Sequence, residues 1–133
     1  MSAAPTLVLR LVSRTDARCV VHNDTEAAVR LWEPGNSWGD PAWWFELMGP
    51  QGQRQVRRQP QDYTRNVPSS REVAPGGSEP WHFDLGDGSW DFDAAADLSA
   101  SELVAVYEAP PSAEAEQHGV LLGPLRSEPV DVP

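Results

Sequence analysis

The densest group of carboxylates in this 133-residue chain lies in residues 84–93, whose sequence is DLGDGSWDFD. Calcium prefers about six to eight hard oxygen ligands, which an acidic loop can supply. An EF-hand loop does not fit, because with Asp84 as position one the third and fifth positions are Gly86 and Gly88, and the twelfth is Ala95. A calcium site of another kind stays open. So does the alternative that the aspartates satisfy backbone amides of a hairpin turn.

Six tryptophans are the clearest excess in the composition. Strand alternation places the neighbours Trp43 and Trp44 on opposite faces, so we expect at least one of them to point away from the interior. An exposed indole can stack on a sugar ring or anchor a protein interface. Alternatively, Trp38 and Trp90 cover the open ends of the fold. The candidate ligand-binding residues are four of the tryptophans and a nearby carboxylate: Trp38, Asp40, Trp43, Trp44 and Trp90.

The residue types that usually perform catalysis are scattered. His22, His82 and His118 stand in separate segments with no second ligand at metal-binding spacing. A copper site of the cupredoxin kind needs histidines and a cysteine close together near the C-terminus, whereas the single cysteine is Cys19. The chain has neither a Gly-x-Ser-x-Gly elbow nor a glycine-rich phosphate loop. We therefore expect no metal, no cofactor and no enzymatic activity.

The charge balance excludes two classes of partner. The chain has 10 arginines, no lysine and 20 acidic residues, for a net charge of −10, so we expect neither nucleic acid nor an anionic membrane as partner. Residues 1–71 hold nine arginines and seven acids, and residues 72–133 hold one arginine and thirteen acids. We expect part of this imbalance to become Arg–carboxylate pairing between the halves. The remaining negative charge favours a partner protein with a basic surface.

No segment resembles a membrane span or a leader. A span needs about 18 consecutive apolar residues, and no stretch approaches that length. The first apolar run, residues 7–12, is short, contains Arg10 and follows no basic region, so it does not fit a signal peptide. With one cysteine, an intramolecular disulfide cannot form. We expect a cytoplasmic location.

Short runs of alternating apolar residues dominate the chain and predict β-strands. The polar link at residues 23–26 predicts a hairpin between the runs that flank it. One short helix is expected at residues 94–102, and a charged loop at residues 110–118. The expected strands lie at residues 7–12, 19–22, 28–32, 43–48, 54–58, 81–85, 102–108 and 121–132, and residues 72–78 are expected to form a short strand that ends in a turn.

Seven to nine short strands joined by Gly- and Pro-rich turns are typical of an all-β fold. We predict one antiparallel β-sandwich domain of immunoglobulin-like type over residues 1–133, with a barrel as the alternative.

The C-terminal half also resembles a known family. The stretches LVAVYEAP and HGVLLGPLRSEPVDV look like the closing strands of immunoglobulin-like modules of bacterial proteins, and VAPGGSEPWHFDLGDGSWDF looks like their proline–glycine turn leading into a strand. The resemblance implies the sandwich fold, and such modules serve many roles. The single cysteine departs from antibody-type domains, which place a disulfide between their sheets.

These observations favour a non-enzymatic interaction module that binds another protein. Two alternatives stay open. One is a carbohydrate-binding module that uses exposed tryptophans, and the other is a sandwich that inhibits a protease with one of its loops. The ligand and the oligomeric state do not follow from the sequence.

Overall fold

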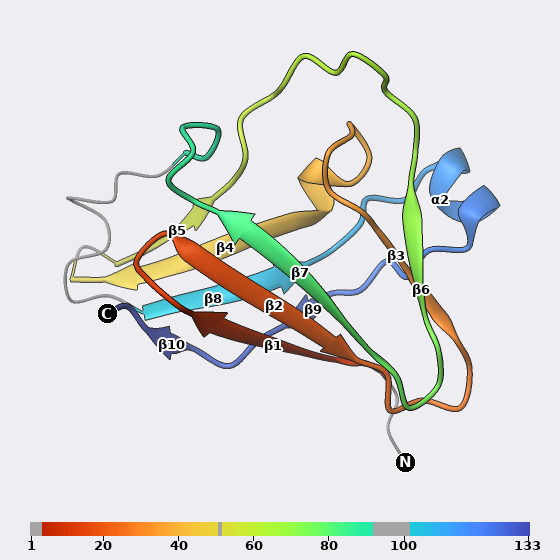
Figure 1. Cartoon of the computed structure of the whole chain (residues 1–133), viewed down its shortest axis with the longest axis horizontal. Coiled ribbons are helices and arrows are strands. Elements are labelled where there is room, and N and C mark those ends of the chain that lie inside the picture. The colour runs from red at the N-terminus through yellow and green to blue at the C-terminus, as the bar shows by residue number, and fades with distance from the viewer. Residues whose placement is uncertain (1–3, 51, 92–101) are drawn as a thin grey trace.

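The computed structural model describes residues 4–50, 52–91 and 102–133, whose strands pair antiparallel in three sheets (Figure 1). The three-stranded sheet has the order β1-β2-β7, with β1 (Thr6–Leu11), β2 (Asp16–His22) and β7 (Ser78–Asp84). The five-stranded sheet comprises β4 (Trp43–Gly49), β5 (Gly52–Val56), β8 (Glu102–Tyr107), β9 (Leu125–Arg126) and β10 (Val130–Asp131). A separate pair is formed by β3 (Val29–Trp32) and β6 (Ser70–Val73).

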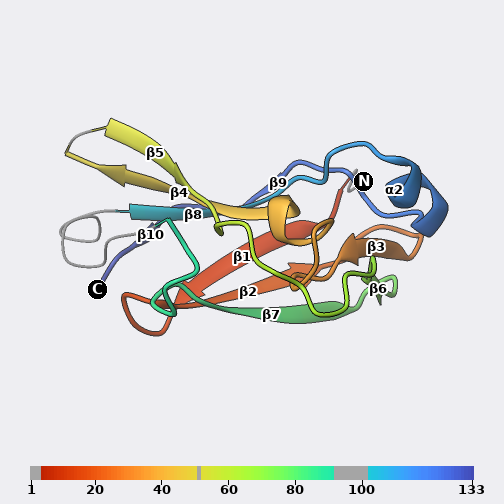
Figure 2. The same cartoon turned by 90° about the horizontal axis from the view of Figure 1, so that it is seen from above.

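The two larger sheets form two layers, which Figure 2 shows from above. In the five-stranded sheet β4 lies between β5 and β8, and both β9 and β10 pair with the other edge of β8. The predicted all-β antiparallel sandwich class is thereby confirmed. The described residues contain ten strands rather than seven to nine, because the last segment forms two strands of two residues each.

The alternation predicted for β4 is confirmed. Trp43, Phe45 and Leu47 join the core between the sheets. Trp44 belongs to a second, smaller cluster with Val104 and Val106. Because successive side chains of a strand point to opposite faces, these two clusters lie on opposite sides of the five-stranded sheet.

Aromatic rings fill the core around Trp43. The centroid of its ring lies 5.0 Å from that of Trp81, 5.5 Å from Phe83 and 4.8 Å from Tyr107. The Tyr107 hydroxyl accepts the backbone N–H of Trp32 at 3.0 Å, and burial raises the pKa of Tyr107 to about 12. Burying one large apolar side chain contributes about 1.5–3 kcal/mol, so this cluster is a main source of stability.

The predicted hairpin between residues 19–22 and 28–32 is wrong. β2 pairs with β1 and β7, whereas β3 pairs with β6. The reason is the fully buried Asn23, whose side-chain amide donates to the carbonyls of Ala27 and Val73, both at 2.9 Å. These bonds make residues 23–27 a corner at which the chain leaves the three-stranded sheet and joins β6.

Two further expectations concern helices. The segment predicted to be a loop, residues 110–118, contains the helix α2 (Ala113–His118). The Ser112 hydroxyl accepts the N–H of Ala115 at 2.9 Å at the start of this helix, and Gly119, with φ 66°, ends it. The helix predicted at 94–102 lies outside the described residues apart from Glu102, which begins β8. In the described part of the chain, no helix has the length and apolar character to cross a bilayer.

Candidate functional site

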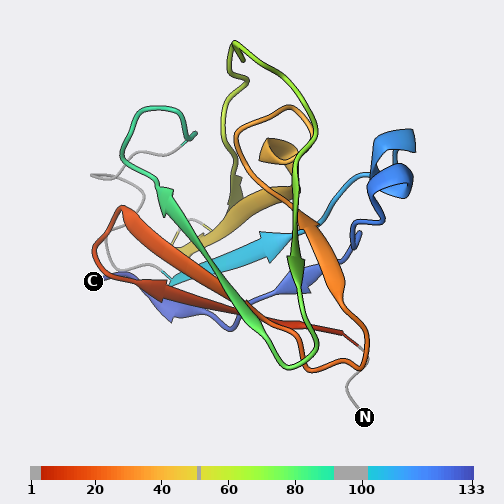
Figure 3. The ribbon, with the colours of Figure 1, turned by 45° about the vertical axis from the view of Figure 1, so that its right-hand side comes forward.

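A cleft of about 320 Å³ opens at one edge of the sandwich, beside β7 and the loops that flank η1 (Asp40–Ala42). We call it the inter-sheet cleft. Its floor is aromatic and its walls are charged. The residues that line it are Pro34, Gly35, Asp40, Trp43, Arg58, His82, Phe83, Asp84, Asp87 and Trp90. Figure 3 shows the long connection between β5 and β6 rising beside the loop that carries η1.

The turn before η1 places Asp40 in the wall of the cleft. The side-chain oxygen of Asn36 accepts the backbone N–H groups of Trp38 at 3.0 Å and Gly39 at 2.7 Å. Gly39 is required here, because a Cβ at that position would lie 1.7 Å from the carbonyl oxygen of Glu33. This tight turn brings Asp40 to the interior, where it is 8% exposed.

Asp40 accepts hydrogen bonds from three groups: two side chains of the connection between β5 and β6 and one backbone N–H of the loop before η1. Arg58 Nη1 donates to both carboxylate oxygens at 3.1 Å, and the N–H of Gly35 donates to Oδ1 at 2.7 Å. The hydroxyl of Tyr63 donates to Oδ2. These donors fix the orientation of the buried carboxylate. The pKa of Tyr63 is raised to about 12, and burial is the main cause. The hydrogen bond to Asp40 and the negative charge of Asp40 also raise this pKa.

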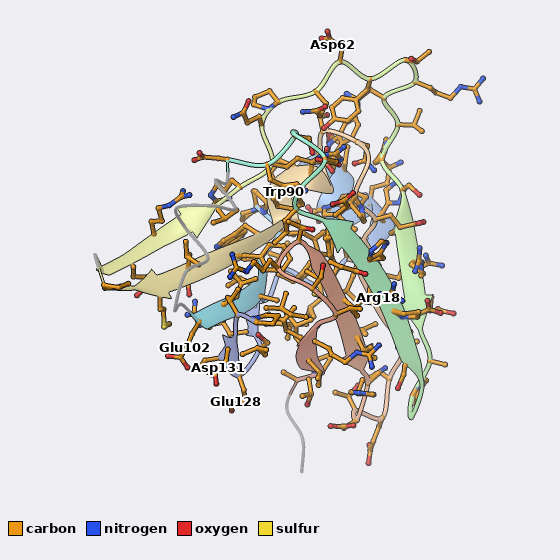
Figure 4. All side chains as sticks on the ribbon, turned by 60° about the vertical axis from the view of Figure 1, so that its left-hand side comes forward. Arg18, Asp62, Trp90, Glu102, Glu128 and Asp131 are labelled. Carbon is orange, nitrogen blue, oxygen red and sulfur yellow. The ribbon has the colours of Figure 1, made fainter. Side chains whose placement is uncertain are left out.

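Arg58 connects Asp40 to the loop after β7. Its Nε donates to the hydroxyl of Ser89 at 3.1 Å, and an isolated antiparallel bridge joins Arg58 to Trp90. The backbone N–H of Gln59 also donates to the carbonyl of Ser89 at 2.7 Å. The loop after β7 is therefore held against the end of β5, and Trp90, 7% exposed, is fixed at the floor of the cleft. Figure 4 shows Trp90 among crowded interior side chains.

Asp87 and Asp84 add two exposed carboxylates to the cleft. Burial alone would raise the pKa of Asp87, but hydrogen bonds from the hydroxyl and N–H of Ser89 and the charge of Arg58 outweigh it and lower the pKa. Asp84 accepts the N–H of Gly86 at 3.0 Å. Three carboxylates thus face one guanidinium in the cleft, so its electrostatic character is negative.

The structure brings together three of the five predicted ligand-binding residues. Asp40, Trp43 and Trp90 line the inter-sheet cleft. Trp38 lies elsewhere, half-buried, with its Nε1–H donating to Glu114 at 3.2 Å. Trp44 lies on the opposite face of its sheet from Trp43.

The expectation that Trp43 or Trp44 points away from the interior has a mixed outcome. Trp44 does leave the core between the sheets, but it is only 7% exposed, and Trp43 is 2% exposed. The two indoles therefore offer no exposed pair of rings on which a sugar could stack.

Sequence reasoning missed Arg58, Tyr63 and Ser89. Arg58 ends an expected strand and Ser89 lies in the acidic loop, whereas Tyr63 lies in a polar segment without periodicity. No local pattern marks these residues as partners of Asp40. For the acidic loop, the described side chains include no group of three or more His, Cys, Asp or Glu residues that could hold a metal ion. Asp93, the last carboxylate of that loop, lies outside the described residues.

Comparisons with protein-family models, curated proteins and solved structures give no match to this chain. What the inter-sheet cleft can bind must therefore follow from its own geometry and charge.

Proposed function

We propose that this protein is a non-enzymatic binding module whose inter-sheet cleft receives a cationic side chain of a partner protein. The observation that supports this most directly is the composition of the cleft, an aromatic floor beneath walls with three carboxylates and one guanidinium. Aromatic ring faces attract cations, and ionised carboxylates pair with them. An arginine or lysine side chain is the group on a protein surface that fits both.

The roles of the charged residues support binding rather than catalysis. Asp40 already accepts from Arg58, Tyr63 and the N–H of Gly35, so it holds the wall in place. Asp84 and Asp87 are exposed and can meet an incoming cation directly. The net charge of −10 adds long-range attraction for a basic partner, which raises the association rate at low salt.

A pair of small probes tests this proposal. We expect N-acetyl-arginine amide to bind and to perturb the fluorescence of the tryptophans, because Trp43 and Trp90 form the floor of the cleft. We expect the neutral isostere N-acetyl-citrulline amide not to bind. The double variant Asp84→Asn/Asp87→Asn should weaken arginine binding about tenfold through the loss of two charge contacts.

The matched control is Asp62→Asn/Glu128→Gln, which changes the net charge equally at exposed positions away from the cleft, both labelled in Figure 4. It should leave the affinity within about twofold of the wild type, because exposed distant charges are screened. Equal losses in the two double variants, or equal binding of the arginine and citrulline probes, would refute the proposal.

A further inference from the structure

The outer face of the five-stranded sheet carries a second cavity, separate from the inter-sheet cleft. It has a volume of about 430 Å³, within the range of sites for small ligands. We call it the Trp44 cavity, because Trp44 lines it where β4 begins. Pro110, Pro111 and Leu122 provide apolar walls, and Leu122 is 39% exposed.

The indole N–H of Trp44 is a buried donor without a hydrogen bond. The residue is 7% exposed, and its Nε1 has no hydrogen-bond partner among the residues that the structure describes. Its neighbour Trp43 differs, because Nε1 of that ring donates to the carbonyl of Trp32 at 2.8 Å. An unsatisfied buried donor destabilises the folded protein, so an acceptor that reached the indole N–H of Trp44 would recover part of this free energy.

The indole N–H of Trp81 also lacks a partner, but its surroundings differ. That ring packs inside the core, with its centroid 5.0 Å from Trp43. Trp44 instead lies on the outer face of its sheet and lines a cavity.

A cation borders the same cavity. The guanidinium carbon of Arg57 lies 4.1 Å from the centroid of the Trp44 ring. Its Nε donates to the side chain of Gln55 at 2.9 Å and its Nη1 to the carbonyl of Pro41 at 3.5 Å. The Arg57 side chain forms no ion pair in the described part of the chain, so its positive charge is available to a ligand.

We propose that the Trp44 cavity binds a small apolar carboxylic acid. The carboxylate accepts hydrogen bonds from the indole N–H of Trp44 and from the guanidinium of Arg57. The apolar body of the acid rests on Pro110, Pro111 and Leu122. Charge-assisted bonds to arginine and a small number of polar groups in an apolar cavity are the usual means by which a protein fixes such a ligand.

Glu108 also lines the Trp44 cavity, and its charge is opposite to that of Arg57. Its side chain is exposed and forms no ion pair with any described residue. Because Arg57 lies against the Trp44 ring whereas Glu108 is exposed to solvent, we expect the attraction of a carboxylate ligand by Arg57 to exceed its repulsion by Glu108. A cationic ligand would have the reverse preference, so variants at these two positions distinguish the sign of the ligand.

The test is calorimetric and NMR titration of the protein with hexanoate, octanoate and 4-phenylbutyrate, each paired with its neutral amide. We expect at least one acid to bind saturably below about 10 mM and its amide to bind at least about tenfold more weakly. Arg57→Gln, at an exposed position, should weaken binding of that acid about tenfold, whereas Glu108→Gln should tighten it about twofold. Arg10→Gln, at an exposed position on the other sheet, is the matched control and should leave binding unchanged.

Trp44→Phe keeps an aromatic ring and removes only the donor with part of the ring. We expect it to weaken binding of the acid by about fivefold to tenfold while the free protein remains folded and its stability is little changed or increased. Failure of all three acids to bind below about 10 mM would overturn the proposal. Equal affinity for acids and amides, or tighter binding after Arg57→Gln, would overturn it as well.

Discussion

The inter-sheet cleft and the Trp44 cavity use adjacent residues of one strand in opposite ways. In the cleft, Trp43 donates its indole N–H to Trp32, and the buried carboxylate of Asp40 accepts hydrogen bonds from three groups. In the Trp44 cavity, the structure gives no described partner for the indole N–H, and no described acid pairs with the cation above it, Arg57. The first site is held rigidly by its own hydrogen bonds, whereas the second leaves two donors for a ligand.

The difference follows from how the two faces of β4 are covered. The inner face is covered by the other sheet, whose strands supply Trp81 and Phe83. On the outer face, Arg57 lies over the ring of Trp44, and Arg126 pairs with Glu46. The inner face of β4 is therefore covered by a packed sheet, whereas arginine side chains lie on its outer face.

The largest expected effect comes from a substitution that removes the hydrogen bonds in the wall of the inter-sheet cleft. Asp40→Ala removes the acceptor of Arg58, Tyr63 and Gly35 N–H, and leaves a guanidinium that is 26% exposed without its partner. We expect a loss of about 2–4 kcal/mol in the free energy of unfolding, measured by urea denaturation. Asp87→Ala, at an exposed position, is the control and should cost less than about 1 kcal/mol. Similar losses for both variants would contradict the rigid-wall interpretation.

The same substitution at the two adjacent tryptophans compares the two sites directly. Trp43→Phe removes a buried hydrogen bond and ring volume from the core, so we expect a loss of about 1–3 kcal/mol. Trp44→Phe removes a donor that has no partner, so we expect a change within about 0.5 kcal/mol, or a gain in stability. Denaturation of both variants under one set of conditions checks this. A larger loss for Trp44→Phe than for Trp43→Phe would reverse the comparison.

The smallest expected effect is a dependence on alkaline pH. An unfolded tyrosine ionises near pH 10.0, whereas the pKa of Tyr63 is raised to about 12 by burial and by Asp40. Above pH 10 the unfolded state therefore loses its proton first, and the stability that Tyr63 contributes is lost progressively up to about pH 12. In Tyr63→Phe the decline should be shallower, as measured by denaturation at several pH values. An unchanged slope would mean that Tyr63 is not held against Asp40. A residual decline is expected, because burial also raises the pKa of Tyr107 to about 12.

Much of the fold could be predicted because the responsible signals are local. The alternation of Trp43, Phe45 and Leu47 predicted the strand and placed these three residues on one face, and the structure shows that this is the inner face. The helix α2 was missed although Ser112 and Gly119, which cap it, are recognisable in the sequence. It is short, and prolines precede it, so its pattern resembles that of a loop.

The difference in charge between residues 1–71 and residues 72–133 is partly compensated by ion pairs that join the two halves of the chain. Arg54 pairs with Asp91, and Arg71 with Glu79 in addition to Glu33. That pairing between the halves was expected, but its partners could not be named, because each depends on which loop lies beside which strand.

The sequence by itself determined that Trp43 and Trp44 occupy opposite sides of β4, since the period of a strand is set by its backbone geometry. It also determined the excess of acid over base. Only the tertiary structure decided that β2 pairs with β7 rather than β3, and that Arg58 and Tyr63 converge on Asp40. Strand pairing and the convergence of loops depend on contacts between residues far apart in the chain. Those contacts are selected by how well the two layers pack and by which buried polar groups find partners, and neither can be read from neighbouring residues.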